Sequence, residues 1–141
     1  MRVAYQAGTR RWLLLPAAIL VLSGLAAGCS SSKPAYCTDA ANLKTSVSNL
    51  GNVNVAANGL SSLQSALSSV QTNANAFASD AKSAFPSQTT ALQNSVSSLG
   101  TAITSAKGQS PLTAASAVVP AVTQVKNSAS SLESAASGKC S

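Results

Sequence analysis

Residues 56–84, AANGLSSLQSALSSVQTNANAFASDAKSA, decide the fold. Apolar side chains recur there in alternating steps of four and three positions, and mostly small polar residues fill the positions between them. This spacing places one apolar stripe along an α-helix and predicts a long amphipathic helix over 55–84. The stripe consists of Ala56, Leu60, Leu63, Leu67, Val70, Ala74, Phe77, Ala81 and Ala84.

Three further segments repeat this pattern, and no segment shows sustained alternation of period two, so we expect no strands. Their stripes are Leu43, Val47 and Leu50; Leu92, Val96, Leu99, Ile103 and Ala106; and Ala115, Val118, Val122, Val125, Ala129, Leu132 and Ala136. We predict an all-α fold with helices over 38–50, 55–84, 87–107 and 111–137.

The residues that flank these segments are typical of helix ends. Thr38 and Ser87 are expected N-caps, and Ser110 followed by Pro111 gives an N-cap with proline at the first helical position. Gly108 suits a helix C-terminus.

Two places along the chain make the helix boundaries harder to predict. Pro120 lies inside the last segment, but the stripe keeps its phase around it, so we expect a kink and not an end. In the stretch 51–59, rich in glycine and asparagine, the first helix either ends or continues.

A repeat within the sequence, which we call the internal echo, predicts that the helices form two related hairpins. Six residues of the first segment, Leu43, Ser46, Val47, Ser48, Leu50 and Gly51, recur 49 positions later as Leu92, Ser95, Val96, Ser97, Leu99 and Gly100. The same offset relates Thr38 to Ser87, Gly59 to Gly108, and Leu63 to Leu112. Two such hairpins would pack as an antiparallel bundle.

Two cysteines lie just outside the two ends of the predicted helical region. In an exported chain, Cys37 and Cys140 are expected to form a structural disulfide; free thiols or intermolecular bridges are the alternatives. An even number of antiparallel helices returns the chain to its starting end, which brings these cysteines together. We therefore predict an up-down-up-down four-helix bundle stapled by one terminal disulfide.

The beginning of the chain has the layout of an export signal. Arg2, Arg10 and Arg11 precede an uncharged run over 12–28 that ends in small residues. The run leads into Leu25-Ala26-Ala27-Gly28-Cys29, which resembles the lipobox of bacterial lipoproteins, although Ala26 stands where leucine is usual. The resemblance covers residues 1 to about 33.

What the resemblance implies is specific. Cleavage falls between Gly28 and Cys29, and the Cys29 thiol takes a diacylglycerol. The chain then divides into a removed signal peptide (1–28), an acylated cysteine with a short tether (29–37) and a helical domain (38–140). An uncleaved membrane anchor, or an ordinary signal peptide that leaves Cys29 as a free thiol, are the alternatives, and export through the Sec or the twin-arginine route stays open.

Composition argues against several classes of function. The chain has no histidine and three acidic residues, which leaves few ways to build a catalytic dyad or a cation site. The segment from residue 29 onward has six lysines, no arginine and a net charge of +3, with only Tyr36, Phe77 and Phe85 as aromatics. These features exclude a nucleic-acid binder. We predict no catalytic residue, no cofactor and no metal site.

Weak matches to catalytic motifs do not change this interpretation. Ser79 and Lys82 have the Ser-x-x-Lys spacing of penicillin-recognising enzymes, but those enzymes need a sheet and a larger domain. We expect Asp39 to be a favourable charge at a helix N-terminus, and Asp80 and Glu133 to be ordinary solvated residues.

Three functions remain, all compatible with an exported protein anchored to the outer face of the cytoplasmic membrane, or to an outer membrane where the cell has one. The first is a non-enzymatic envelope module, structural or docking. Its partners would be membrane lipid, through the acylated Cys29, and an envelope protein or wall polymer. The second is a carrier of a lipid or small apolar ligand in a core pocket near Pro120. The third is an inhibitor or chaperone-like subunit with an exposed apolar patch. The oligomeric state stays open.

Overall fold

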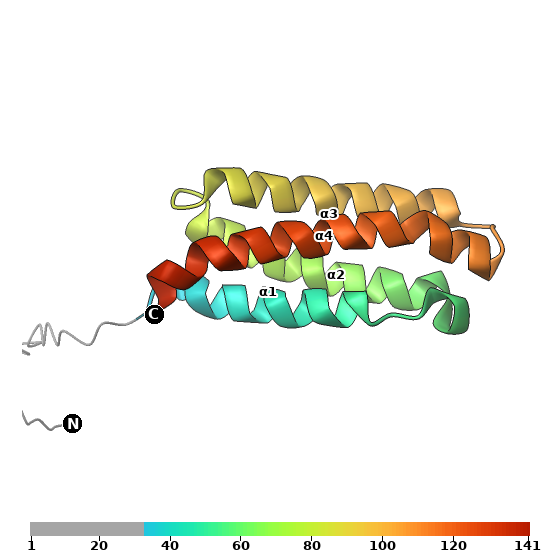
Figure 1. Cartoon of the computed structure of the whole chain (residues 1–141), viewed down its shortest axis with the longest axis horizontal. Coiled ribbons are helices and arrows are strands. Elements are labelled where there is room, and N and C mark those ends of the chain that lie inside the picture. The colour runs from blue at the N-terminus through green and yellow to red at the C-terminus, as the bar shows by residue number, and fades with distance from the viewer. Residues whose placement is uncertain (1–32) are drawn as a thin grey trace, which may run out of the picture. The chain divides into compact units, whose positions relative to one another are not determined.

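Four helices account for almost all of residues 33–141, the part of the chain that our computed structural model describes (Figure 1). They are α1 (Ala35–Gly51), α2 (Val55–Ala81), α3 (Pro86–Ala106) and α4 (Pro111–Cys140). No strand occurs among these residues. The predicted all-α class and four helices are confirmed, whereas the predicted signal peptide, Gly28 and Cys29 lie outside the described residues.

The helices run alternately up and down, and each packs against the next along the chain, with α4 returning beside α1 (Figure 1). The two diagonally opposite pairs of helices differ in how closely they approach. Helices α2 and α4 contact each other across the bundle, whereas no Cα atom of α1 lies within 8 Å of one in α3. Alanines at buried positions of both α2 and α4 explain this close approach, because a methyl group keeps two backbones apart the least.

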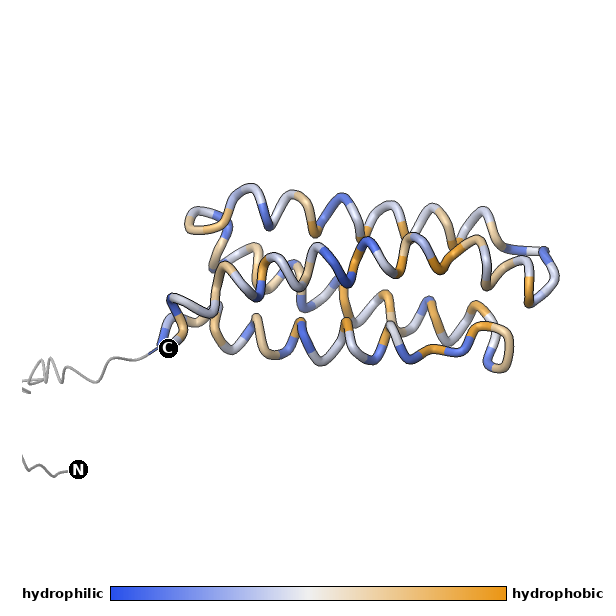
Figure 2. Tube along the Cα trace, viewed as in Figure 1, coloured by the Kyte–Doolittle hydropathy of each residue, from blue (hydrophilic) through white to orange (hydrophobic). Residues whose placement is uncertain are grey.

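The predicted stripes form most of the core, and in Figure 2 the apolar positions recur along every helix. The stripe of α3 is buried throughout, and so are Leu43, Val47 and Leu50 of α1. The first half of α4 differs from the prediction. Ala114 and Ala121 are buried there, while the predicted Ala115 and Val122 are only partly buried. In the pair Ala121 and Val122 the smaller residue faces the core because α2 lies so close.

Serine and threonine are tolerated in these helices because their hydroxyls bond to the preceding turn. Thr72 and Thr104, for example, donate to the carbonyl oxygens of Ser68 and Gly100, both at 3.0 Å. Such bonds give many of these hydroxyls a partner within the helix, although the buried hydroxyl of Thr89 in α3 has none.

The internal echo is structurally real for α1 and α3. The two buried serines, Ser46 and Ser95, each donate to the carbonyl oxygen three residues earlier, at 2.8 Å in both cases. The leucines and valines around them are buried alike. The echo fails for Leu63 and Leu112, because Leu63 is buried while the side chain of Leu112 is 77% exposed.

Two of the predicted N-caps are wrong. Helix α1 begins at Ala35, after Pro34, and α3 begins at Pro86, after Phe85, so Thr38 and Ser87 lie inside helices. The predicted cap Ser110 is confirmed, since its hydroxyl accepts from the Thr113 N–H at 3.4 Å. Helix α4 passes through Pro120 and ends three residues later than predicted.

Glycine settles the boundary between α1 and α2. Helix α1 ends at Gly51, and a three-residue link follows that ends with Asn54, whose Oδ1 accepts from the Ala57 N–H at 3.0 Å. One helical turn follows before Gly59, whose φ of 76° and ψ of 174° interrupt α2. These angles are open almost only to glycine. The first helix therefore does not continue through this stretch.

Candidate functional site

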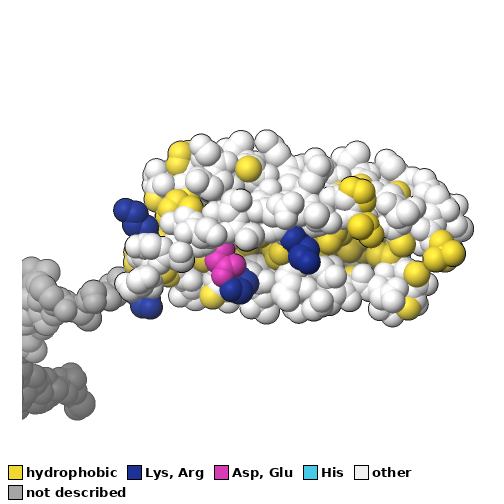
Figure 3. Space-filling view, in the orientation of Figure 1, with side chains coloured by type: hydrophobic (Ala, Val, Ile, Leu, Met, Phe, Trp, Pro, Cys, Tyr) yellow, Lys and Arg dark blue, Asp and Glu magenta, His cyan; other side chains and the backbone are white. Residues whose placement is uncertain are grey.

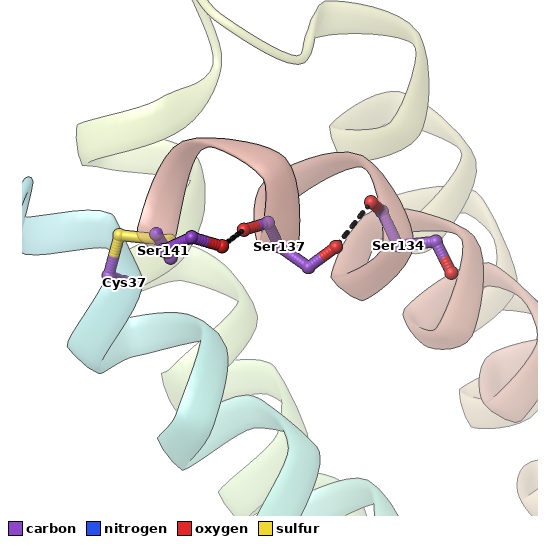
Figure 4. The surroundings of a disulfide bond; sticks show 5 residues. Cys37, Ser134, Ser137 and Ser141 are labelled. Carbon is purple, nitrogen blue, oxygen red and sulfur yellow. Dashed lines mark hydrogen bonds between the residues drawn. A yellow bond between two sulfur atoms is a disulfide. The ribbon is translucent and has the colours of Figure 1, made fainter.

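The disulfide closes one end of the bundle. Cys37 lies in the first turn of α1 and Cys140 is the last residue of α4, with Cα atoms 5.7 Å apart. Figure 4 shows the bridge beside hydrogen bonds of the last turn, where the Ser141 hydroxyl donates to the carbonyl oxygen of Ser137 at 2.8 Å. The predicted pairing is confirmed, but both cysteines belong to helices and do not lie outside them.

An aromatic cluster packs at the same end of the bundle. Tyr36 lies edge-on to Phe85 and to Phe77, with ring centroids 5.5 and 6.2 Å away. Phe77 is fully buried and Phe85 nearly so. The contact of the partly buried Tyr36 with these rings explains why α1 begins before the predicted Thr38, since the first turn gains an apolar contact of its own.

Two carboxyl groups face each other across α1 and α2. Helix α1 begins at Ala35, so Asp39 stands in its second turn and the predicted role at the helix N-terminus is wrong. Partial burial raises the pKa of Asp39, and the charge of Asp80 and a hydrogen bond with its side chain raise it further. Sequence distance hides this pair, because the two residues are brought together only by the hairpin.

This pair predicts a pH dependence of stability. The folded state holds the proton of Asp39 more tightly than the unfolded chain, so the free energy of unfolding falls as pH rises from the ordinary pKa of 3.8 through the raised one. Asp80→Asn should make this fall smaller while leaving the part due to burial. Thermal melts of both proteins between about pH 3 and pH 7 measure it. Identical pH profiles would contradict the pairing.

A furrow between α1 and α4 carries the charged side chains of this face. Lys44 of α1 forms an ion pair with Glu133 of α4. The side chain of Glu133 is still 43% exposed, in agreement with the solvated position that we expected, but it has a partner on another helix. Further along, a Cβ added to Gly51 would lie 3.3 Å from Cδ of Lys126, which shows that this lysine lies against the end of α1. Figure 3 shows the basic and acidic side chains and the apolar floor between the two helices.

The opposite side of the bundle is polar but uncharged. Helix α3 has no charged residue, and two adjoining depressions of about 320 and 510 Å³ between α2 and α3 are open to solvent. Their polar lining consists of Gln71, Asn75, Gln93, Ser97, Thr101, Thr104 and Ser105. Amides and hydroxyls of this kind offer hydrogen bonds but no group suited to acid–base chemistry.

The first half of α4 carries an apolar stripe on its outer surface. The side chain of Leu112 is 77% exposed and that of Val119 is 58% exposed, and the partly buried Ala115 and Val122 lie between and beside them. We call these four residues the α4 stripe. Sequence reasoning missed it, because Val119 falls outside every predicted stripe and Leu112 was matched to the buried Leu63. The apolar side chains gather toward the end of the bundle away from the disulfide (Figure 3).

The two residues with motif spacing lie on the surface. Ser79 and Lys82 are both exposed at the end of α2. Residues 33–141 contain no group of three or more carboxylates or cysteines that could hold a metal ion. None of the helices in this range is both long enough and apolar enough to cross a membrane. The predicted lipid site, Cys29, lies outside the described residues.

Comparison with known proteins gives no further direction for the function. No family model matches the chain, and neither a curated protein nor a solved structure matches it.

Proposed function

We propose that this chain is a non-enzymatic lipoprotein of the bacterial cell envelope, held to a membrane by an acylated Cys29, and that its helical bundle acts as a structural and docking module. The observation that carries this proposal is the geometry of the disulfide end. Helix α1 begins there and α4 ends there, joined by Cys37 and Cys140. An anchor before α1 would therefore hold the bundle by one end.

The dimensions of the chain suit a module that projects from a surface. Residues 30–33 separate Cys29 from Pro34, so the Cα atoms of Cys29 and Pro34 are at most about 18 Å apart when the chain is extended. Helix α4 has 30 residues and is about 45 Å long. In this proposal the disulfide end stays close to the lipid, and the end that carries Leu112 is presented well away from it.

The interior and the surface both favour docking over transport or catalysis. The largest core side chains, which include Phe77, Leu99 and Leu132, are less than 2% exposed. A carrier would need a pocket in the core, whereas the depressions described above lie on the surface. The surface offers neutral hydrogen-bonding groups and one exposed apolar stripe, which are features of contact with a partner.

Cys29→Ala tests the anchor. We expect this variant to lose lipid attachment and to leave the membrane fraction of intact cells, because the thiol is the site of acylation. Immunoblots of membrane and soluble fractions measure the distribution. Cys37→Ser is the matched control, since it removes a cysteine eight residues away without touching the lipobox, and it should stay in the membrane fraction. Retention in the membrane of an exported Cys29→Ala protein that has lost residues 1–28 would overturn the proposal.

A further inference from the structure

The α4 stripe exists because α1 is shorter than α4. Four residues of α4 follow one another at intervals of seven positions and therefore share one side of the helix: Leu112, Val119, Lys126 and Glu133. On this side Glu133 pairs with Lys44 of α1, and Lys126 lies against Gly51, where α1 ends. Leu112 and Val119 therefore continue the α1-facing side of α4 into a region that α1 does not reach.

The other hairpin shows that this side of the helix need not be apolar. Six buried residues of α2 correspond to buried residues of α4 at an offset of 51, among them Leu63, Leu67, Val70 and Ala74 against Ala114, Val118, Ala121 and Val125. Val55 and Phe77 of α2 and Ala136 of α4 have no buried counterpart in the other helix. At the same offset the four residues of the α4 stripe correspond to Ser61, Gln64, Ser68 and Gln71 of α2, which are all polar and exposed. Bundle packing thus leaves this position free to be polar, and α4 alone makes it apolar.

We propose that the α4 stripe is the contact between two copies of this chain, paired side by side through parallel α4 helices. Its members follow one another in steps of three, four and three, which is the spacing of a coiled-coil seam. No charged residue occurs over 111–125, so two copies meet there without like-charge repulsion. Lys126, turned against α1, marks the end of the seam.

The anchor decides the orientation of this pair, and in this respect the inference rests on the proposed function. Two copies held by their disulfide ends in one membrane have parallel α4 helices at the same height. A two-fold axis along the bundle then places each residue of the stripe opposite its own equivalent, as an isologous contact requires.

The size of the stripe makes the pairing depend on the membrane. Four side chains, two of them partly buried, offer far less area than the roughly 1,200 Å² or more that stable dimers in solution bury. Confinement to one surface raises the effective concentration of the partner, so a weak contact becomes populated. The released protein is therefore a monomer in dilute solution and the anchored protein a dimer.

Photocrosslinking tests this contact. The photoreactive residue p-benzoylphenylalanine replaces Val119 in the full-length protein, and the matched control carries it at Ser68, the corresponding exposed position on α2. Membranes isolated from cells that make each protein are irradiated, and immunoblots measure the adduct with twice the mass of the protein. We expect this adduct from position 119 and at least about tenfold less from position 68. Adding Leu112→Ser to the position-119 protein should reduce it by a similar factor.

Each other outcome overturns the inference. Equal yields from positions 119 and 68 would mean random collision, and adducts from position 119 with other proteins only would mean a different occupant. A membrane-bound protein that gives no homodimer adduct refutes the pairing and leaves the lipid anchor intact. A protein absent from the membrane fraction refutes the anchor instead, so the two failures are distinguishable.

Discussion

Cys37→Ser should lower the melting temperature of the bundle by about 15 to 20 °C. The bridge joins residues 103 positions apart, and closing so long a loop removes much of the conformational freedom of the unfolded chain. On the chain-entropy model this contributes about 4 to 5 kcal/mol to the free energy of unfolding. Because many core residues are alanine and valine, the free energy of unfolding is small, and losing the bridge removes a large part of it.

Thermal melts followed by circular dichroism measure this effect. The wild-type protein with a reducing agent is the matched control, and it should melt at the temperature of Cys37→Ser. The helical signal at low temperature should persist in both, because the four stripes remain. An unchanged melting temperature in the variant would contradict a stabilising role for the bridge.

Leu99→Ala should destabilise the bundle by about 2 to 5 kcal/mol. Leu99 of α3 is completely buried, so its truncation removes apolar contacts and leaves a cavity among side chains from the other helices. Leu112→Ala is the matched control, because it deletes the same atoms from a side chain that is 77% exposed. We expect the control to change stability by no more than about 0.5 kcal/mol.

Urea unfolding of the two variants separates these cases through their transition midpoints. A similar loss of stability for both would mean that Leu112 packs into the bundle, and the α4 stripe would then be part of the core. A large loss for Leu99→Ala alone would support a stripe that is free to contact a partner.

The number of helices and the pairing of the disulfide could be predicted from the sequence. Periodicity identifies helices wherever the apolar stripe is continuous, as it is in α3 from Leu92 to Ala106. The pairing of Cys37 with Cys140 follows from an even number of antiparallel helices, and the structure contains it. Both properties are set by local spacing and by counting, which need no knowledge of side-chain contacts.

The candidate site was harder to predict, because it depends on distances between helices. In α4, Val122 is larger and more apolar than Ala121, yet the close approach of α2 buries the alanine. Leu112 lies 49 positions after the buried Leu63, the offset at which the two hairpins match, but α1 does not extend far enough to cover it. Helix lengths and the close approach of α2 to α4 decide both outcomes, and neither is encoded in the pattern of one segment.

Charge contacts were missed for a similar reason. Lys44 and Glu133 are 89 residues apart in the chain, and Asp39 and Asp80 lie on different helices. The composition correctly indicates how few charges the domain carries, but only the packing of α4 and α2 against α1 shows which of them meet.

The most direct test of the account is the intact mass of the mature protein taken from the membrane fraction. We expect a chain that begins at Cys29, carries a diacylglycerol on that residue and contains the bridge between Cys37 and Cys140. Fragmentation of the first peptide should place the lipid on the Cys29 thiol. A chain that begins elsewhere, or one with an unmodified Cys29, would contradict the claim that the bundle is a lipid-anchored module.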